Sequence, residues 1–132
     1  MRKTAIGLFG VLVILLSLCG CSTVQLDPEA AVTLTFIYGD THVEATLTDS
    51  EAATVIAALN GKRYQSPLDG VPSCGFDGNV SLSVGGRRFA VACDTCNTVQ
   101  DLGNLQFFTI PKEDMEQIHA LFEAYGGHFP CV

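Results

Sequence analysis

Five stretches of the chain alternate apolar and polar side chains with a period of two, the pattern typical of β-strands. In the clearest of them, valine and leucine alternate with asparagine and serine. Gly39-Asp40 provides a turn between the first two stretches, and Gly85-Gly86 is a two-residue turn of the kind that tight hairpins need. The predicted strands are residues 32–38, 42–47, 76–84, 87–93 and 105–109, with residues 101–104 as the turn before the last one.

Helical periodicity appears at two places and predicts two amphipathic helices. The first begins with a capping box, Thr48 at the N-cap and Glu51 three residues later, and ends at Asn60-Gly61. The second follows Pro111, which suits the first position of a helix, and ends at Gly126-Gly127. Their apolar faces carry Ala52, Val55, Ile56 and Leu59 in the first, and Met115, Ile118, Phe122 and Tyr125 in the second.

The order of these elements is ββα-βββα. Hairpin connections favour antiparallel pairing, because no helix crosses over between parallel strands. We therefore expect an α+β fold, a single antiparallel sheet of about five strands with two helices on one face. This domain occupies residues 31–132, and the polar residues before it are expected to form a short tether over residues 22–30.

The N-terminus has the pattern of an export leader. Arg2 and Lys3 precede an apolar run of 14 residues, Ala5 to Leu18. That length suits the apolar region of a signal peptide and is short for a bilayer span, which takes about 20 residues.

The apolar run ends in Leu18-Cys19-Gly20-Cys21. This segment resembles the lipobox of bacterial lipoproteins, with Leu at −3, a small residue at −1 and Cys at +1, although Cys at −2 is unusual. The resemblance implies that residues 1–20 are a signal peptide, that cleavage follows Gly20, and that Cys21 carries lipid. The acyl chains would then hold the protein on a membrane, facing away from the cytoplasm.

The charge of the chain argues against one class of partner. The chain has 7 Lys+Arg and 14 Asp+Glu, a net charge of −7, and removal of Arg2 and Lys3 with the leader leaves 5 against 14, or −9. Nucleic-acid binding needs a basic face, so nucleic acid is not an expected partner. We expect a monomer.

Four cysteines remain after Cys19 and Cys21: Cys74, Cys93, Cys96 and Cys131. An even number in a small exported domain predicts two disulfides. The hairpin register about Gly85-Gly86 puts Gly78 opposite Cys93 and Cys74 near Cys96, which favours Cys74–Cys96 with Cys93–Cys131. The alternative is Cys93–Cys96 with Cys74–Cys131, and we lean to it because a CxxC pair can close locally.

The Cys93-Asp94-Thr95-Cys96 segment also raises the alternative of a thiol–disulfide enzyme. A redox CxxC needs its first sulfur at a helix N-terminus, where the thiol pKa is lowered. Here the first cysteine ends a predicted strand and no helix follows. A four-cysteine zinc site is disfavoured too, because the chain has a single CxxC and exported thiols oxidise. Neither a metal nor another cofactor is expected.

No catalytic constellation stands out, so we expect no enzyme activity. Arg87 and Arg88 place positive charge at a hairpin tip of an acidic domain, where they are candidate partner contacts. Residues 79–96 and 125–132 resemble the small cysteine-bearing lipoproteins of Gram-positive bacteria, a resemblance that implies no activity. The leading hypothesis is a membrane-anchored binding module for an extracytoplasmic protein. The alternatives are a CxxC redox protein and an inhibitor that presents the loop 62–73 to an extracytoplasmic enzyme.

Overall fold

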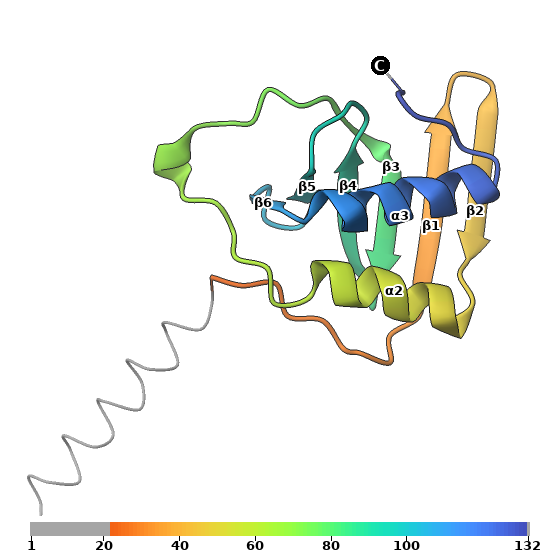
Figure 1. Cartoon of the computed structure of the whole chain (residues 1–132), viewed down its shortest axis with the longest axis horizontal. Coiled ribbons are helices and arrows are strands. Elements are labelled where there is room, and N and C mark those ends of the chain that lie inside the picture. The colour runs from red at the N-terminus through yellow and green to blue at the C-terminus, as the bar shows by residue number, and fades with distance from the viewer. Residues whose placement is uncertain (1–21, 132) are drawn as a thin grey trace, which may run out of the picture.

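The computed structural model describes residues 22–131, which form one six-stranded sheet and two α-helices (Figure 1). Every neighbouring pair of strands is antiparallel, and their order across the sheet is β2-β1-β3-β4-β5-β6. The elements are β1 (Val32–Tyr38), β2 (Thr41–Thr46), α2 (Asp49–Leu59), the 3-10 turn η1 (Pro67–Asp69), β3 (Phe76–Val84), β4 (Arg87–Ala92), β5 (Thr98–Asp101), β6 (Phe107–Thr109) and α3 (Lys112–Ala124).

Both helices lie across the same face of the sheet (Figure 1). The alternate residues of the strands that point to this face are valine, leucine and phenylalanine, and they pack against the apolar sides of α2 and α3. The side chains with no exposed surface include Val32, Leu34, Phe36, Val55, Leu59, Val80, Leu82, Phe89, Phe108, Ile118 and Phe122. The α+β class and the antiparallel sheet predicted from the sequence are confirmed.

Polar contacts fix the start of α2 and join it to the end of α3. The capping box of α2 forms as predicted, with the Thr48 hydroxyl accepting from the Glu51 amide and the Glu51 carboxylate accepting from the Thr48 amide. Tyr125, just after α3, donates from its hydroxyl to Glu51 Oε2 at 2.7 Å. This bond lowers the pKa of Glu51 and joins the start of α2 to the end of α3.

The sheet has six strands where about five were expected, in the order ββα-ββββα. The additional strand is β5, which pairs with β4 on one side and β6 on the other. Its four residues, Thr98 to Asp101, include one apolar side chain, Val99. A segment this short has too little alternation to predict a strand; its pairing with neighbours on both sides makes it one.

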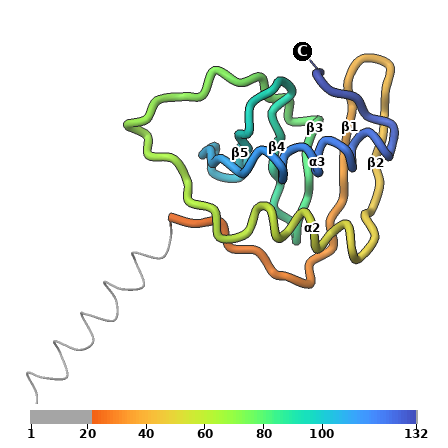
Figure 2. The backbone as a smooth tube through the Cα atoms, viewed as in Figure 1, coloured from red at the N-terminus to blue at the C-terminus, as the bar shows by residue number. Residues whose placement is uncertain are grey.

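The N-terminal segment differs from the expected tether, because the chain packs against the domain from Ser22 onward (Figure 2). Val24 has no exposed surface and belongs to the core. Its amide donates to the Lys62 carbonyl at 2.8 Å, and its carbonyl accepts from the Gly61 amide at 2.7 Å. Thr23 also pairs with Arg63 as an antiparallel bridge. The segment before residue 31 is therefore part of the folded domain and not a free tether.

The predicted signal peptide, residues 1–20, and the predicted lipid attachment at Cys21 lie outside the described residues. Among residues 22–131, neither helix has the length and apolar composition needed to cross a membrane.

Candidate functional site

The four cysteines form two disulfides, one between Cys74 and Cys96 and one between Cys93 and Cys131. Their Cα–Cα distances are 6.0 Å and 4.8 Å, respectively. The prediction of two disulfides is confirmed. The pairing of Cys93 with Cys96, which we favoured because the two are close in sequence, is wrong.

The observed pairing is the one that the hairpin register favoured, although a bulge in β3 changes that register. Leu82 lies opposite Phe89 as predicted, but the register shifts between Phe76 and Ser81, so that Phe76 lies opposite Ala92. The Cys93 amide then donates to the Gly75 carbonyl at 2.8 Å, and the expected placement of Gly78 opposite Cys93 is wrong. Cys74, the residue before Gly75, lies beside the loop that contains Cys96 and is bonded to it.

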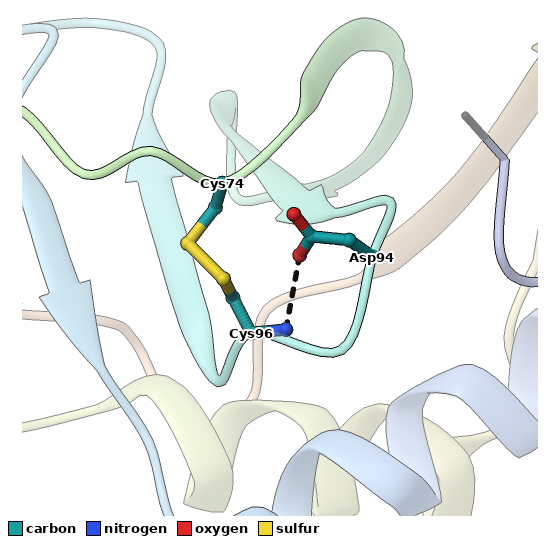
Figure 3. A group of neighbouring side chains, drawn as sticks. All are labelled: Cys74, Asp94 and Cys96. Carbon is teal, nitrogen blue, oxygen red and sulfur yellow. Dashed lines mark hydrogen bonds between the residues drawn. A yellow bond between two sulfur atoms is a disulfide. The ribbon is translucent and has the colours of Figure 1, made fainter.

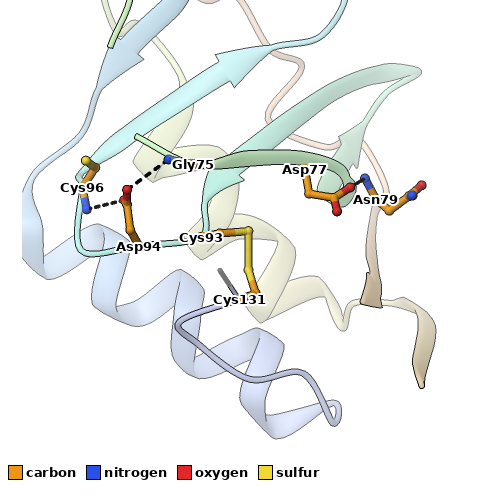
Figure 4. The surroundings of a disulfide bond; sticks show 7 residues. All are labelled: Gly75, Asp77, Asn79, Cys93, Asp94, Cys96 and Cys131. Carbon is orange, nitrogen blue, oxygen red and sulfur yellow. Dashed lines mark hydrogen bonds between the residues drawn. A yellow bond between two sulfur atoms is a disulfide. The ribbon is translucent and has the colours of Figure 1, made fainter. Parts of the chain in front are cut away.

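The two bridges differ in exposure. We call Cys93–Cys131 the inner disulfide, because its cysteines are 2% and 3% exposed. We call Cys74–Cys96 the outer disulfide, because both of its cysteines are only partly buried. The inner disulfide joins the end of β4 to the C-terminal tail (Figure 4). The outer disulfide joins the loop before β3 to the loop after β4.

Asp94 organises the loop around the outer disulfide (Figure 3). One carboxylate oxygen accepts from the Cys96 amide at 2.9 Å, and the other accepts from the Gly75 amide at 3.0 Å. The Asp94 carboxylate and the sulfurs of Cys74 and Cys96 lie within 4.8 Å of one another. Metal ligation by cysteine requires thiolates, and in the oxidised protein both of these sulfurs are bonded to each other. The arrangement therefore serves the loop and not a metal.

The two cysteines of the CxxC segment belong to different disulfides. A CxxC oxidoreductase cycles between a dithiol and a disulfide made by the same two sulfurs, with the attacking thiolate accessible. Cys93 is 2% exposed and is bonded to the C-terminal tail. The geometry is that of a structural cross-link.

Arg87, a candidate partner contact, lies in a polar network at the edge of the core. Its guanidinium donates to Asp101 Oδ2 at 2.7 Å, to the Tyr64 hydroxyl at 2.8 Å and to the Gln25 carbonyl at 2.8 Å. Tyr64 in turn donates to Asp101 Oδ2 at 2.6 Å. The network thus holds together the N-terminal segment, the loop after α2, β4 and β5.

The Asp101 carboxylate carries the negative charge of this network, and its side chain is 3% exposed. Burial by itself would raise the pKa of Asp101. Hydrogen bonds from Tyr64, the Gly103 amide and Arg87, together with the positive charge of Arg87, outweigh burial and lower this pKa below its usual value. Burial and the hydrogen bond to Asp101 raise the pKa of Tyr64. The carboxylate is therefore ionised and Tyr64 protonated near neutral pH.

Arg88 points to the opposite face of the sheet, because successive strand residues alternate. It is exposed and donates to the Gly78 carbonyl at 2.6 Å and to the Ser81 hydroxyl at 3.3 Å. Together the two arginines line a shallow cleft of about 420 Å³ at the end of the sheet, with Gly86, Asp101 and residues 102–104. Of the two arginines, Arg88 is the one whose charge has no carboxylate partner among the described residues.

Sequence reasoning missed the roles of Tyr64, Asp94 and Asp101. Tyr64 is the one aromatic residue in the loop after α2, and an aromatic residue in a polar loop indicates a side chain that packs against the domain. The two aspartates have the sequence context of ordinary turn residues, and nothing local marks the groups they bond.

Comparisons with family models, with curated protein sequences and with solved structures find no match for this chain.

Proposed function

We propose that this chain is a membrane-anchored lipoprotein on the outer side of a cytoplasmic membrane, and that its domain binds an extracytoplasmic protein without catalysing a reaction. The observation that carries the proposal is the occurrence of two disulfides in a domain that directly follows a lipobox-like leader. Disulfides persist in oxidising compartments and are rare in the cytoplasm, so the cross-links and the leader indicate the same destination.

The polar side chains with unusual environments support a binding role over a catalytic one. Asp94 accepts two backbone amides, Asp101 is bonded to Arg87 and Tyr64, and Glu51 caps a helix and bonds Tyr125. Each of these groups stabilises the fold through bonds within the protein. Among the described residues, none of them is paired with a nucleophile in the way that covalent catalysis requires.

The partner surface we propose is the cleft between the β3–β4 and β5–β6 hairpins, with Arg88 as its charged contact. The domain is acidic, so an exposed arginine beside a cleft favours a partner that presents a carboxylate there. Arg87 contributes less, because Asp101 already balances its charge at 2.7 Å.

The anchor is tested by mass spectrometry and membrane fractionation of the full chain in a bacterium that processes lipoproteins. We expect a diacylglyceryl group on Cys21, and in Cys21→Ser neither the lipid nor cleavage after Gly20. Cys19→Ser is the matched control, because it changes the neighbouring cysteine to a residue common at −2 and should keep the lipid. Parent protein without lipid on Cys21, or cleavage after Gly20 in the Cys21→Ser protein, would refute the anchor.

The partner surface is tested with a photo-crosslinking residue in place of Asn104, an exposed residue of the same cleft, so that Arg88 is kept; the lipidated protein is used in membranes of the parent organism. Gln117, exposed on α3, is the control position. We expect a discrete adduct from position 104 and none from position 117. Equal adducts from both positions, or none from either, would count against this surface.

The inhibitor alternative has one structural observation in its favour. The loop after α2 is held at both ends, by the hydrogen bond of the Tyr64 amide to Ser22 and by the outer disulfide at Cys74, and it presents Leu68 with 97% of its surface exposed. An enzyme bound by this loop would bury Leu68.

A further inference from the structure

The exposed apolar side chains of the domain lie near Ser22, the first described residue. Three large apolar side chains among residues 22–131 are mostly exposed: Leu68 at 97%, Val71 at 82% and Leu105 at 65%. Leu68 lies on η1, and Val71 and Leu105 line one cleft with Pro67 and Phe107. Large apolar side chains grouped in this way mark a surface that contacts another phase or another molecule.

Ser22 lies against the same loop. Its carbonyl accepts from the Tyr64 amide at 3.0 Å, and Ser22 lines one cleft with Pro67, Asp69 and Gln106. Because consecutive α-carbons are about 3.8 Å apart, a lipid on the preceding residue begins within one residue of this cleft. No flexible linker separates that lipid from the apolar loop, since the chain is packed on the domain from Ser22.

We propose that Leu68, Val71 and Leu105 contact the lipid surface that holds the anchored N-terminus, so that the domain has one fixed orientation on the membrane. This inference rests on the proposed lipid anchor. The occupant is a lipid surface because the described chain begins beside these side chains and the apolar leader residues precede it. Apolar side chains at such a surface enter the boundary between headgroups and acyl chains to a depth of about 5–10 Å.

The charges near Ser22 fit this contact. The protein after the leader has five basic residues, and two of them, Lys62 and Arg63, are bonded through their backbones to Val24 and Thr23. Basic side chains beside an apolar contact suit an anionic lipid surface. The acidic residue of η1, Asp69, is engaged within the turn, because its carboxylate accepts from the Ser66 amide at 3.1 Å.

The contact places one edge of the sheet at the membrane. Leu68, Val71 and Leu105 belong to the loop after α2 and to the β5–β6 turn, at the β6 edge of the sheet. With that edge on the membrane, β2 is at the opposite edge, away from the lipid. His42 lies on β2, and its side chain is 67% exposed.

The chain contains no tryptophan, so a single introduced tryptophan reports on one position. The full chain carrying Leu68→Trp is purified with its lipid and placed in vesicles of phosphatidylglycerol and phosphatidylcholine brominated on the acyl chains. Bromine quenches tryptophan within a short distance. The control is His42→Trp in the same vesicles, and the mass of the N-terminal peptide establishes lipidation in each sample.

We expect the tryptophan at position 68 to lose most of its emission in brominated vesicles and the tryptophan at position 42 to keep its emission. Lipidated protein in which neither position is quenched, or both are quenched equally, would overturn the fixed membrane contact and leave the anchor standing. A tryptophan at position 68 shielded from acrylamide and from bromine alike would overturn it too, because the loop would then be covered by protein. Protein without lipid on Cys21 would overturn the proposed anchor and this inference together.

Discussion

Replacing Val24 with alanine tests whether the N-terminal segment is part of the folded domain. A residue in a flexible tether would contribute nothing to stability. Val24, in contrast, has no exposed surface, lies in the core cluster, and is bonded through its backbone to Gly61 and Lys62. The segment would therefore unfold together with the sheet and the helices.

The expected loss follows from the atoms removed. Val24→Ala deletes two methyl groups from a fully buried side chain, at about 0.8 kcal/mol each, and a residual cavity adds to this. The sum is about 2 kcal/mol of unfolding free energy. For a domain of this size, that corresponds to a decrease of about 10 °C in Tm.

The assay is urea unfolding of the oxidised domain, followed by circular dichroism, with a matched Gln25→Ala variant. The Gln25 side chain is exposed, and its backbone carbonyl, which accepts from Arg87, is unchanged by the substitution. We expect the midpoint to fall for Val24→Ala at an unchanged m-value, and Gln25→Ala to remain within about 0.5 kcal/mol of the parent. Equal midpoints for all three proteins would refute the reasoning and return residues 22–30 to the role of a tether.

Three further predictions follow from the polar network and the disulfides. Arg87→Met leaves the buried Asp101 carboxylate without its cation and should lower the unfolding free energy by about 1.5–3 kcal/mol. Arg88→Met, measured by the same urea assay, should lower it by less than about 0.5 kcal/mol. Equal losses for the two variants would contradict the network. Because the pKa of Asp101 is lowered by folding, its contribution to stability is complete above the pKa of an unfolded aspartate, about 4, and is lost as the pH falls through the folded value. Stability measured from pH 7 to pH 2 should therefore fall less steeply for Asp101→Asn than for the parent, and parallel curves would argue against an ionised Asp101 in the folded state. A reductant added stepwise should open the outer disulfide before the inner one, because the sulfurs of the outer disulfide are more accessible. Alkylation and peptide mass mapping give the order, and the reverse order would show that exposure does not govern the reactivity of the two disulfides.

The disulfide pairing shows how far sequence reasoning reached, because the hairpin register favoured the observed pairing and sequence proximity favoured the other. The hairpin register about Gly85-Gly86 correctly placed Leu82 opposite Phe89, but a bulge further along β3 shifts the remaining pairs. A bulge adds residues to one strand without a strong local signal, so its position depends on how the whole strand packs. Proximity in sequence favoured Cys93–Cys96, and the fold instead directs Cys93 to the buried tail.

The site residues show the same division. The arginines at the hairpin tip were identified from their charge, but their different roles follow from strand alternation and from neighbours distant in sequence. Arg87 reaches Asp101, Tyr64 and the carbonyl of Gln25, which is 62 residues away. No pattern along the chain encodes that contact.

The sequence by itself determined the features that depend on neighbours within a few residues. Alternation with a period of two set the longer strands, Thr48 and Glu51 set the start of α2, and paired glycines set the β3–β4 hairpin, because each is a local hydrogen-bonding or steric preference. The tertiary structure decided the β5 strand, the choice between the two cysteine pairings and the docking of Val24. In each of these a short segment gains its stability from burial against residues far along the chain, and such contacts leave no periodic trace in the sequence.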